Sequence, residues 1–301
     1  MNGVVGLTIS TGSVRGLGSS YSYEDLDKIA QYVLTCTKQR PKIAIICGSG
    51  LGGLAETLSE KECLAYKDIP NFPVSTVPGH AGRLVFGKIG DKSVMCMQGR
   101  FHMYEGYPAW KCAMPVRVMK LMGVNTLFVT NAAGGVNPDY HVGDLMLIKD
   151  HINMPGMASN NPLVGDNDER FGVRFPAMTE AYDKKLRKLA HEIANNLGFG
   201  DFLRDGVYTM LGGPSFETIA ELRYLRLIGT DAIGMSTCPE VVTARHCGMR
   251  VFGMSLITNV CVMDYEDDRV PNHEEVLETG KMRAGDMELL IRRLVSEMED
   301  E

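Results

Sequence analysis

Apolar, β-branched runs alternate along the chain with segments of helical periodicity, and this alternation restricts the fold more than any other feature. It predicts an α/β fold, a single domain with a central, largely parallel mixed β-sheet flanked by helices. The expected strands are residues 43–46, 94–97, 126–130, 145–148, 207–211, 232–234 and 251–257. The expected helices are residues 110–122, 180–196, 218–227, 240–247 and 274–297.

Composition excludes several classes of function. The chain has 301 residues, of which 45% are apolar and 23% charged, as in ordinary globular proteins. Its net charge of −6, without a long basic run, argues against nucleic acid as a ligand. No apolar run approaches the roughly 18 residues of a membrane span. The eight cysteines show no C-x-x-C spacing, which favours buried, reduced thiols and a cytoplasmic location.

The chain divides into two unequal parts. Residues 1–21 are rich in Gly, Ser, Thr and Val and lack the pattern of a signal peptide, so we expect a disordered extension or a leftover from the expression vector. Ser22 and Asp25 form the pattern of a capping box, which predicts a helix at the start of a domain over residues 22–301. Residues 156–178 form a long loop rich in Gly and Pro.

Polar clusters follow six of the expected strands, each where the strand ends. In open parallel sheets, ligands bind outside the carboxyl ends of the strands. The clusters therefore predict one site gathered from distant segments of a single domain. They begin at Gly48, Gln98, Asn131, Gly212, Met235 and Thr258.

The first cluster is a glycine-rich turn that presents backbone amides to an anion. Gly48, Gly50 and Gly53 have the G-x-G-x-x-G spacing of a dinucleotide site. Such a site also requires a second strand ending in an acidic residue about 20 positions later. Asp68 is near that position but ends no clear apolar strand. A phosphate of another kind therefore remains the main alternative to a dinucleotide.

The other clusters supply groups for an anion and for a planar base. Arg100 offers a planar fork suited to phosphate, and Ser49, His102 and Ser236 can add hydrogen bonds. Glu217 and Asn259 can bond the edge of a heterocycle, and Phe216 and Tyr104 can pack against it. Taken singly, each residue has an ordinary structural explanation, and the hypothesis rests on their coincidence at strand ends. The seven histidines show no metal-ligand spacing.

These segments resemble the trimeric, low-molecular-mass purine nucleoside phosphorylases, and the animal enzymes in particular. The resemblance covers about residues 23–294 and several motifs in the same order. It implies reversible phosphorolysis of 6-oxopurine (deoxy)ribonucleosides, such as inosine and guanosine, to the free purine and (deoxy)ribose 1-phosphate in purine salvage. The motifs are Gly48-Ser-Gly-Leu-Gly, His80-Ala-Gly, Gln98-Gly-Arg-Phe-His-Met-Tyr-Glu-Gly106, Thr130-Asn-Ala-Ala-Gly-Gly135, Gly213-Pro-Ser-Phe-Glu-Thr218, Gly234-Met-Ser-Thr and Ile257-Thr-Asn.

The resemblance also implies a role for each matching residue, a homotrimer, and inorganic phosphate as co-substrate without a metal or other cofactor. Phosphate would contact Ser49, His80, Arg100, His102, Ser236 and the backbone of Ala132. Ribose would contact Tyr104, Met235, His273 and, from the neighbouring subunit, Phe175. The base would contact Glu217, Asn259, Phe216, Ala133, Gly134 and Cys261. Asn259, Glu217, His102 and His273 would be the catalytic residues.

Three other functions are alternatives: two enzymatic activities and a non-catalytic nucleoside sensor. A methylthioadenosine phosphorylase would favour Asp at position 259 and lack the glutamate at position 217. An NAD-dependent oxidoreductase follows from the glycine spacing alone. The chain also departs from the animal pattern, because Val260 and Cys261 follow Asn259 where Lys and Val are usual. This difference leaves open the preference between inosine and guanosine and the tolerance of adenosine.

Overall fold

A computed structural model describes residues 21–49, 51–77, 80–268 and 273–299, with only the backbone for 273–277 and 279–282. In this part of the chain nine strands form one mixed sheet, in the order β2-β3-β4-β1-β5-β8-β7-β6-β9. The single α/β domain expected from the sequence is confirmed. The strands are β1 (Ile43–Cys47), β2 (Ser59–Ala65), β3 (Arg83–Ile89), β4 (Lys92–Gln98), β5 (Thr126–Gly135), β6 (Leu145–Asn153), β7 (Leu203–Met210), β8 (Ala232–Gly234) and β9 (Arg250–Val260).

Half of the sheet closes on itself. Strand β9 pairs with β6 and also with β5, so the strands β5-β8-β7-β6-β9 form a ring. Within the ring, β6, β7 and β8 run parallel to one another and antiparallel to β5 and β9. The sheet is therefore not the open one that the position of the polar clusters implied. The segments after β7 and β8 still reach the end of β5, because Gly134 pairs with Ile233.

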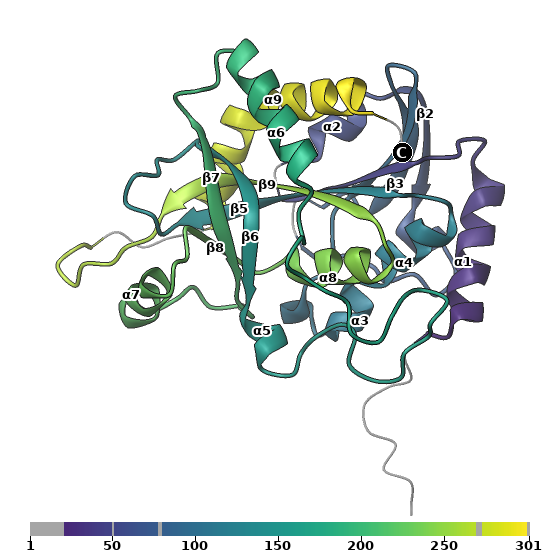
Figure 1. Cartoon of the computed structure of the whole chain (residues 1–301), viewed down its shortest axis with the longest axis horizontal. Coiled ribbons are helices and arrows are strands. Elements are labelled where there is room, and N and C mark those ends of the chain that lie inside the picture. Colours follow the sequence, from purple (N-terminus) through teal and green to yellow (C-terminus); the bar gives the residue numbers. More distant parts are fainter. Residues whose placement is uncertain (1–20, 50, 78–79, 269–272, 300–301) are drawn as a thin grey trace, which may run out of the picture.

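Helices cover both faces of the sheet (Figure 1). Successive residues of β1 point to opposite faces, and both faces are buried: Ala44 and Ile46 pack toward α1, α4 and α8, whereas Ile43 and Ile45 pack toward α2, α6 and α9. The α-helices are α1 (Tyr23–Cys36), α2 (Gly53–Glu56), α3 (Ala109–Cys112), α4 (Met114–Leu121), α5 (Met154–Met157), α6 (Lys184–Asn196), α7 (Ile219–Leu227), α8 (Cys238–His246) and α9 (His273–Glu297). Two 3₁₀ turns are η1 (Tyr66–Asp68) and η2 (Met103–Glu105).

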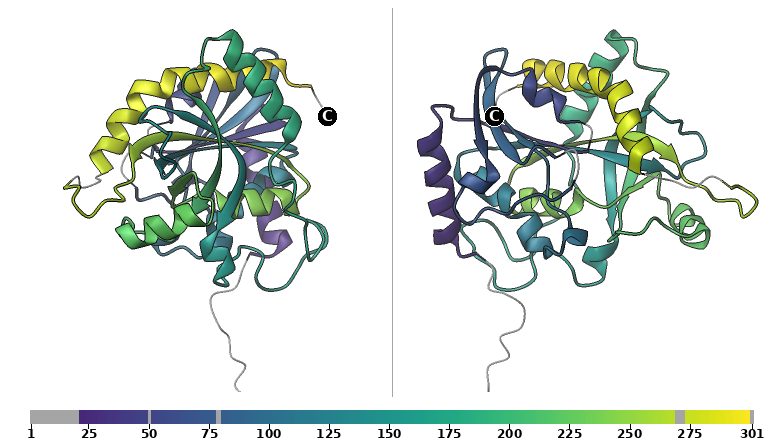
Figure 2. Two further views of the ribbon diagram at one scale, coloured as in Figure 1. Left: turned by 60° about the vertical axis from the view of Figure 1, so that its left-hand side comes forward. Right: turned by 180° about the vertical axis from the view of Figure 1, so that it is seen from behind.

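One helix lies apart from the two layers. Helix α7 and the segment that follows β9 project from the same side of the molecule (Figure 2). Arg223 of α7 joins them, since its Nε donates to the carbonyl oxygen of Met263 at 2.9 Å and its guanidinium lies 4.6 Å from the ring of Tyr265. The segment that leads into α7 includes Phe216 and Glu217, two of the residues that the sequence pointed to.

Most elements begin near their expected residues, with two informative differences. Ser22 caps α1 in the expected capping box. The helix expected over residues 110–122 is two helices, because a new helix starts at Met114 with Pro115 in its first turn, where the missing N–H of proline is tolerated. Strands β2 and β3 were not expected. Strand β3 pairs antiparallel with β4 across a turn at Gly90, and β2 is a largely exposed edge.

The proposed limit between the extension and the domain stays a prediction. Residues 1–20 lie outside the described residues. Tyr21 packs edge-on against Trp110, and its hydroxyl donates to the carbonyl oxygen of Asn71 at 2.7 Å. Among the described helices, none is both long and apolar enough to cross a membrane.

A close approach of two strands explains why glycine follows β1. A Cβ at Gly48 would lie 2.7 Å from the carbonyl oxygen of Thr130 and 2.8 Å from the Cα of Asn131, both backbone atoms of β5. The Gly48 amide donates to the Thr130 hydroxyl at 3.2 Å. This contact holds the turn that carries Ser49 directly against β5.

We therefore expect a Gly48→Ala variant to lose about 1–3 kcal/mol of unfolding free energy, because backbone atoms must shift to admit the methyl group. Gly52→Ala is the matched control in the same turn, since its Cβ would meet only the Gln98 side chain at 3.5 Å. Chemical denaturation at one protein concentration measures both. Equal stability of the two variants would contradict the close-approach argument.

Candidate active site

The ends of β5, β7, β8 and β9 and the turns after β1 and β4 surround one cavity of about 720 Å³. Its volume is within the range of small-molecule sites. The wall contains most of the residues that the sequence pointed to: Ser49, Arg100, His102, Tyr104, Ala132, Ala133, Gly134, Phe216, Glu217, Met235, Ser236, Asn259 and Cys261. Residues that lie up to 212 positions apart in the sequence therefore line a single space.

Strands β5 and β9 run side by side beneath this cavity. Both extend beyond their expected ends, and after a register shift between Ala133 and Gly134, Gly134 pairs with Asn259. A Cβ at Gly134 would lie 2.9 Å from the Cys261 sulfur and 3.3 Å from the Asn259 Nδ2. The absence of a side chain at Gly134 therefore lets the polar groups of β9 lie close to β5.

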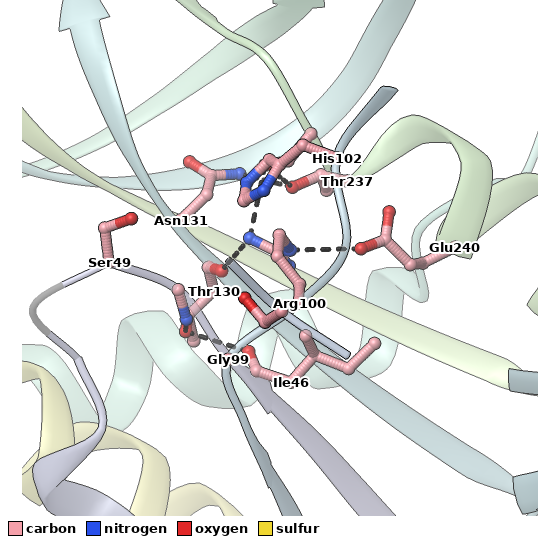
Figure 3. A network of polar contacts seen from close by, with 12 residues as sticks. Ile46, Ser49, Gly99, Arg100, His102, Thr130, Asn131, Thr237 and Glu240 are labelled. Atoms are coloured by element: carbon pink, nitrogen blue, oxygen red, sulfur yellow. Dashed lines mark hydrogen bonds and ion pairs between the residues drawn. The ribbon is translucent and has the colours of Figure 1, made fainter. Parts of the chain in front are cut away.

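Arg100 lies at one end of the cavity with its side chain only 2% exposed. Its Nε donates to Glu240 Oε1 at 3.0 Å, and its Nη1 donates to the Thr130 carbonyl at 2.8 Å (Figure 3). Nη1 also donates to Ser236 Oγ at 3.2 Å. The Nη2 atom is buried and has no partner among the described residues. Buried donors are normally satisfied, so this orphaned N–H group indicates an anion or another acceptor in the cavity.

His80 adds a neutral donor beside Ser49. Burial, then electrostatic interactions with His102 and with the Arg100 guanidinium, lower the pKa of His80 to about 4. Its Nδ1 accepts from the backbone N–H of Arg100 at 3.3 Å, which places the proton on Nε2. Nε2 lies 3.3 Å from Ser49 Oγ, so the imidazole donates there and leaves the serine proton for a ligand. His80 therefore acts on the site through Ser49.

His102 has the opposite arrangement. Its Nδ1 donates to Glu105 Oε2 at 3.1 Å, and Glu105 also accepts from the amide and hydroxyl of Thr76, both at 2.7 Å. Burial alone would raise the pKa of Glu105, but these hydrogen bonds lower it to about 2. Burial lowers the pKa of His102 despite this carboxylate. In the neutral imidazole, Nε2 is therefore an acceptor.

The far end of the cavity suits a flat, partly apolar ligand. Burial raises the pKa of the Glu217 carboxyl, and burial together with Glu217 raises the pKa of the Cys261 thiol to about 12. Asn259 Oδ1 accepts from the Thr258 hydroxyl at 3.3 Å, which holds the amide in place. Phe216 is 44% exposed at the rim, where it can cover a ligand.

Three of the expected residues do not line the cavity. His80 lies behind the wall, where it contacts Ser49, the backbone N–H of Arg100 and the ring of His102. Phe175 is 86% exposed on the loop before α6, as a residue meant for another subunit would be, and its role stays a prediction. His273 is the first residue of α9, and its side chain lies outside the described part of the structure.

Several residues that shape the site were not singled out from the sequence. Glu240, which pairs with Arg100, lies 140 positions away and has no local signal. Glu105 lies three residues after His102, a spacing that could have revealed the pair. The dinucleotide interpretation fails, because the helix after the glycine turn has only four residues. Among the described residues, no group of three metal-ligating side chains occurs.

The sequence and the fold match known proteins over almost the whole chain. The model of the phosphorylase superfamily matches residues 42–296. Purine nucleoside phosphorylase of Bos taurus is 58% identical over 280 residues, which cover 93% of this chain and 97% of the relative. Purine nucleoside phosphorylase 1 of Bacillus subtilis is 50% identical and covers 91% and 98%. The solved Schistosoma mansoni purine nucleoside phosphorylase in complex with inosine has a TM-score of 0.90 and 49% identity, and covers 94% and 100%.

The low pKa of His80 gives a pH dependence in phosphate-free buffer. The unfolded chain takes up the His80 proton below about pH 6.5, but the folded chain does so only near pH 4. The unfolding free energy must therefore fall as the pH decreases through this window. We expect His80→Gln to make this decrease shallower, as measured by urea unfolding between pH 7 and 4. The exposed His141 supplies the control, and a His141→Gln variant with the same effect would contradict the assignment.

Proposed function

The chain belongs to the phosphorylase superfamily and, within it, to the purine nucleoside phosphorylases, and on this basis we propose that its cavity catalyses phosphate-dependent cleavage of purine nucleosides. The products are the free purine and (deoxy)ribose 1-phosphate. The solved Schistosoma mansoni relatives in complex with inosine and with guanosine support 6-oxopurine nucleosides as substrates. Inorganic phosphate is the co-substrate.

The single observation that carries the proposal is the unsatisfied Nη2 of the buried Arg100 guanidinium. Arg100 lines the same cavity as Ser49, Ser236 and His102. These groups are matched to phosphate, whose oxygens accept from the guanidinium and the hydroxyls. The hydroxyl group of a phosphate monoanion or dianion can donate to the acceptor Nε2 of His102.

The base of the nucleoside binds at the opposite end of the cavity, which places its sugar between the base and the phosphate. Glu217 accepts from the N1–H of a 6-oxopurine, and Asn259 bonds N7 and O6. Tyr104 and Met235 contact the ribose, and Phe216 packs on the base. An adenine lacks a proton on N1, so the carboxylate of Glu217 favours hypoxanthine and guanine. Asn259 also distinguishes the site from a methylthioadenosine phosphorylase, in which an aspartate is expected.

Bond cleavage needs no protein nucleophile. As the C1′–N9 bond stretches, the ribose becomes an oxocarbenium-like cation and negative charge grows on the purine. Asn259 stabilises that charge through a hydrogen bond at N7 that strengthens in the transition state. The phosphate held by Arg100 faces the cation, then attacks C1′ to form the sugar phosphate. Binding both reactants in one cavity supplies the required orientation.

Assembly and location complete the proposal. The enzyme is a homotrimer in which Phe175 of one subunit reaches the sugar site of the next, and His273 bonds the 5′-hydroxyl. The 86% exposure of Phe175 supports a partner at that position. The trimer works in the cytoplasm, a reducing compartment that suits the eight free cysteines.

Phosphate dependence tests the function directly. We expect the wild-type protein to release hypoxanthine from inosine when inorganic phosphate is added, with equimolar ribose 1-phosphate, and to release none without it. Chromatography of both products makes the measurement. Release without phosphate would identify a hydrolase instead, and tight inosine binding without turnover would identify a sensor.

The role of Asn259 gives a second test. We expect Asn259→Ala to lower kcat for inosine by about 10²-fold or more, because one transition-state donor is lost. Asn196→Ala, at the end of α6, is the matched control and should retain wild-type kcat. Steady-state kinetics at saturating phosphate decide the result. A near-normal kcat for Asn259→Ala would remove this residue from the catalytic role.

A further inference from the structure

A chain of buried hydroxyl and amide groups ends at Ser236, beside the unsatisfied guanidinium N–H of Arg100. Asn131 Nδ2 donates to Thr237 Oγ1 at 2.8 Å (Figure 3). Thr237 Oγ1 lies 3.1 Å from Ser236 Oγ, which accepts from Arg100 Nη1 at 3.2 Å. Asn131 and Ser236 line the cavity, whereas Thr237 is fully buried behind them.

The direction of the hydrogen bond between the two hydroxyls follows from their surroundings. Among the described residues, the Thr237 hydroxyl contacts only Asn131, which donates to it, and Ser236. Thr237 is 0% exposed, so its own proton has no acceptor except Ser236 Oγ. Ser236 Oγ then accepts from both Thr237 and Arg100, and its proton is left to point into the cavity.

The backbone of Ser236 cannot replace this proton, because its N–H donates to the Tyr208 hydroxyl at 3.3 Å. The hydroxyl is therefore the group that Ser236 can offer to an anion. A hydroxyl that already accepts two hydrogen bonds is a stronger donor, because bonds in such chains polarise one another.

We infer that Thr237 is a positioning residue for phosphate, and that with Asn131 it holds the Ser236 hydroxyl as a donor to the co-substrate. The inference rests on the proposed function, since it names the support of the phosphate end of the same site. Thr237 touches no substrate atom and acts only through Ser236.

The backbone at Thr237 supports this role. Its φ is +79° and its ψ is −49°, and the N–H of Cys238 donates to the carbonyl oxygen of Ser236 at 2.9 Å, closing a γ-turn. This conformation is rare and strained for a β-branched residue. Strained residues of this kind cluster at functional sites, where the surrounding structure holds them. The turn brings the Thr237 hydroxyl back against Ser236, one residue before it.

The test compares two variants of similar size. Thr237→Ala removes the hydroxyl, whereas Thr237→Ser keeps it and loses only the methyl group. We expect Thr237→Ala to raise the KM for inorganic phosphate about 3- to 10-fold relative to Thr237→Ser, the effect of one lost neutral hydrogen bond. The KM for inosine should be the same in both. Equal KM values for phosphate in the two variants would overturn the inference.

Two further variants separate this effect from a loss of structure. Thr209→Val removes a buried hydrogen bond between the hydroxyls of Thr209 and Thr230, whose oxygens are 2.7 Å apart. Neither residue lines the cavity, so this variant should leave the KM for phosphate unchanged. If Thr237→Ala does not fold, Thr237→Gly replaces it, because glycine accepts a positive φ while still lacking the hydroxyl. A Thr209→Val variant with the same rise in the KM for phosphate would also overturn the inference.

Calorimetric titration with inorganic phosphate gives the same comparison without turnover. Weaker phosphate binding by Thr237→Ala than by Thr237→Ser would support the positioning role, and equal binding would refute it. A wild-type protein that binds phosphate but does not cleave inosine would refute the proposed function alone. The two failures are therefore distinguishable.

Discussion

The buried ion pair between Arg100 and Glu240 is the interaction on which the site depends. Both side chains are removed from water, and leaving either charge unpaired costs several kcal/mol, about 3–5. Glu240 bonds Nε, and the Thr130 carbonyl and Ser236 Oγ bond Nη1, so the guanidinium plane has one orientation. That orientation leaves Nη2 for a ligand. Because Glu240 belongs to α8 and Thr130 to β5, the packing of a helix against the sheet sets the direction of one N–H group.

The closed ring of strands explains how a single cavity can accommodate the two proposed ligands, phosphate and a purine nucleoside. Strand β5 passes from Thr130, beside Arg100, to Gly134, beside Asn259, within five residues. An extended strand rises about 3.3 Å per residue, so the four steps from Thr130 to Gly134 span about 13 Å, which leaves room for a ribose between the Arg100 end and the Asn259 end. Strand β8 runs antiparallel to β5, and the segments after β7 and β8 contribute Phe216, Glu217, Met235 and Ser236 to the wall of the same cavity. Gly48 and Gly134 are needed because larger side chains would separate these backbones.

The sequence predicted much of this arrangement, and the misses have physical causes. Periodicity located α1, α6, α7, β1 and β8 well, because each is a local pattern of burial. It did not locate β2, whose side chains are mostly exposed and show no apolar run. The cavity-wall residues were anticipated because motifs are local too, and their individual roles remain proposals. Glu240 was missed, since a partner 140 residues away leaves no mark in the neighbourhood of Arg100.

By itself, the sequence determined the α/β class, the family, and which segments carry polar groups at strand ends, because these properties reside in composition, spacing and order. Only the tertiary structure decided how those groups are protonated and directed. His80 is partly buried and His102 is buried, yet a backbone amide makes the first imidazole a donor at Nε2 and a carboxylate makes the second an acceptor at Nε2. Thr237 likewise acquires its position from a strained turn and from Asn131, which lies 106 residues earlier. A hydrogen bond has a direction only when both partners are in place, and folding is what brings them together.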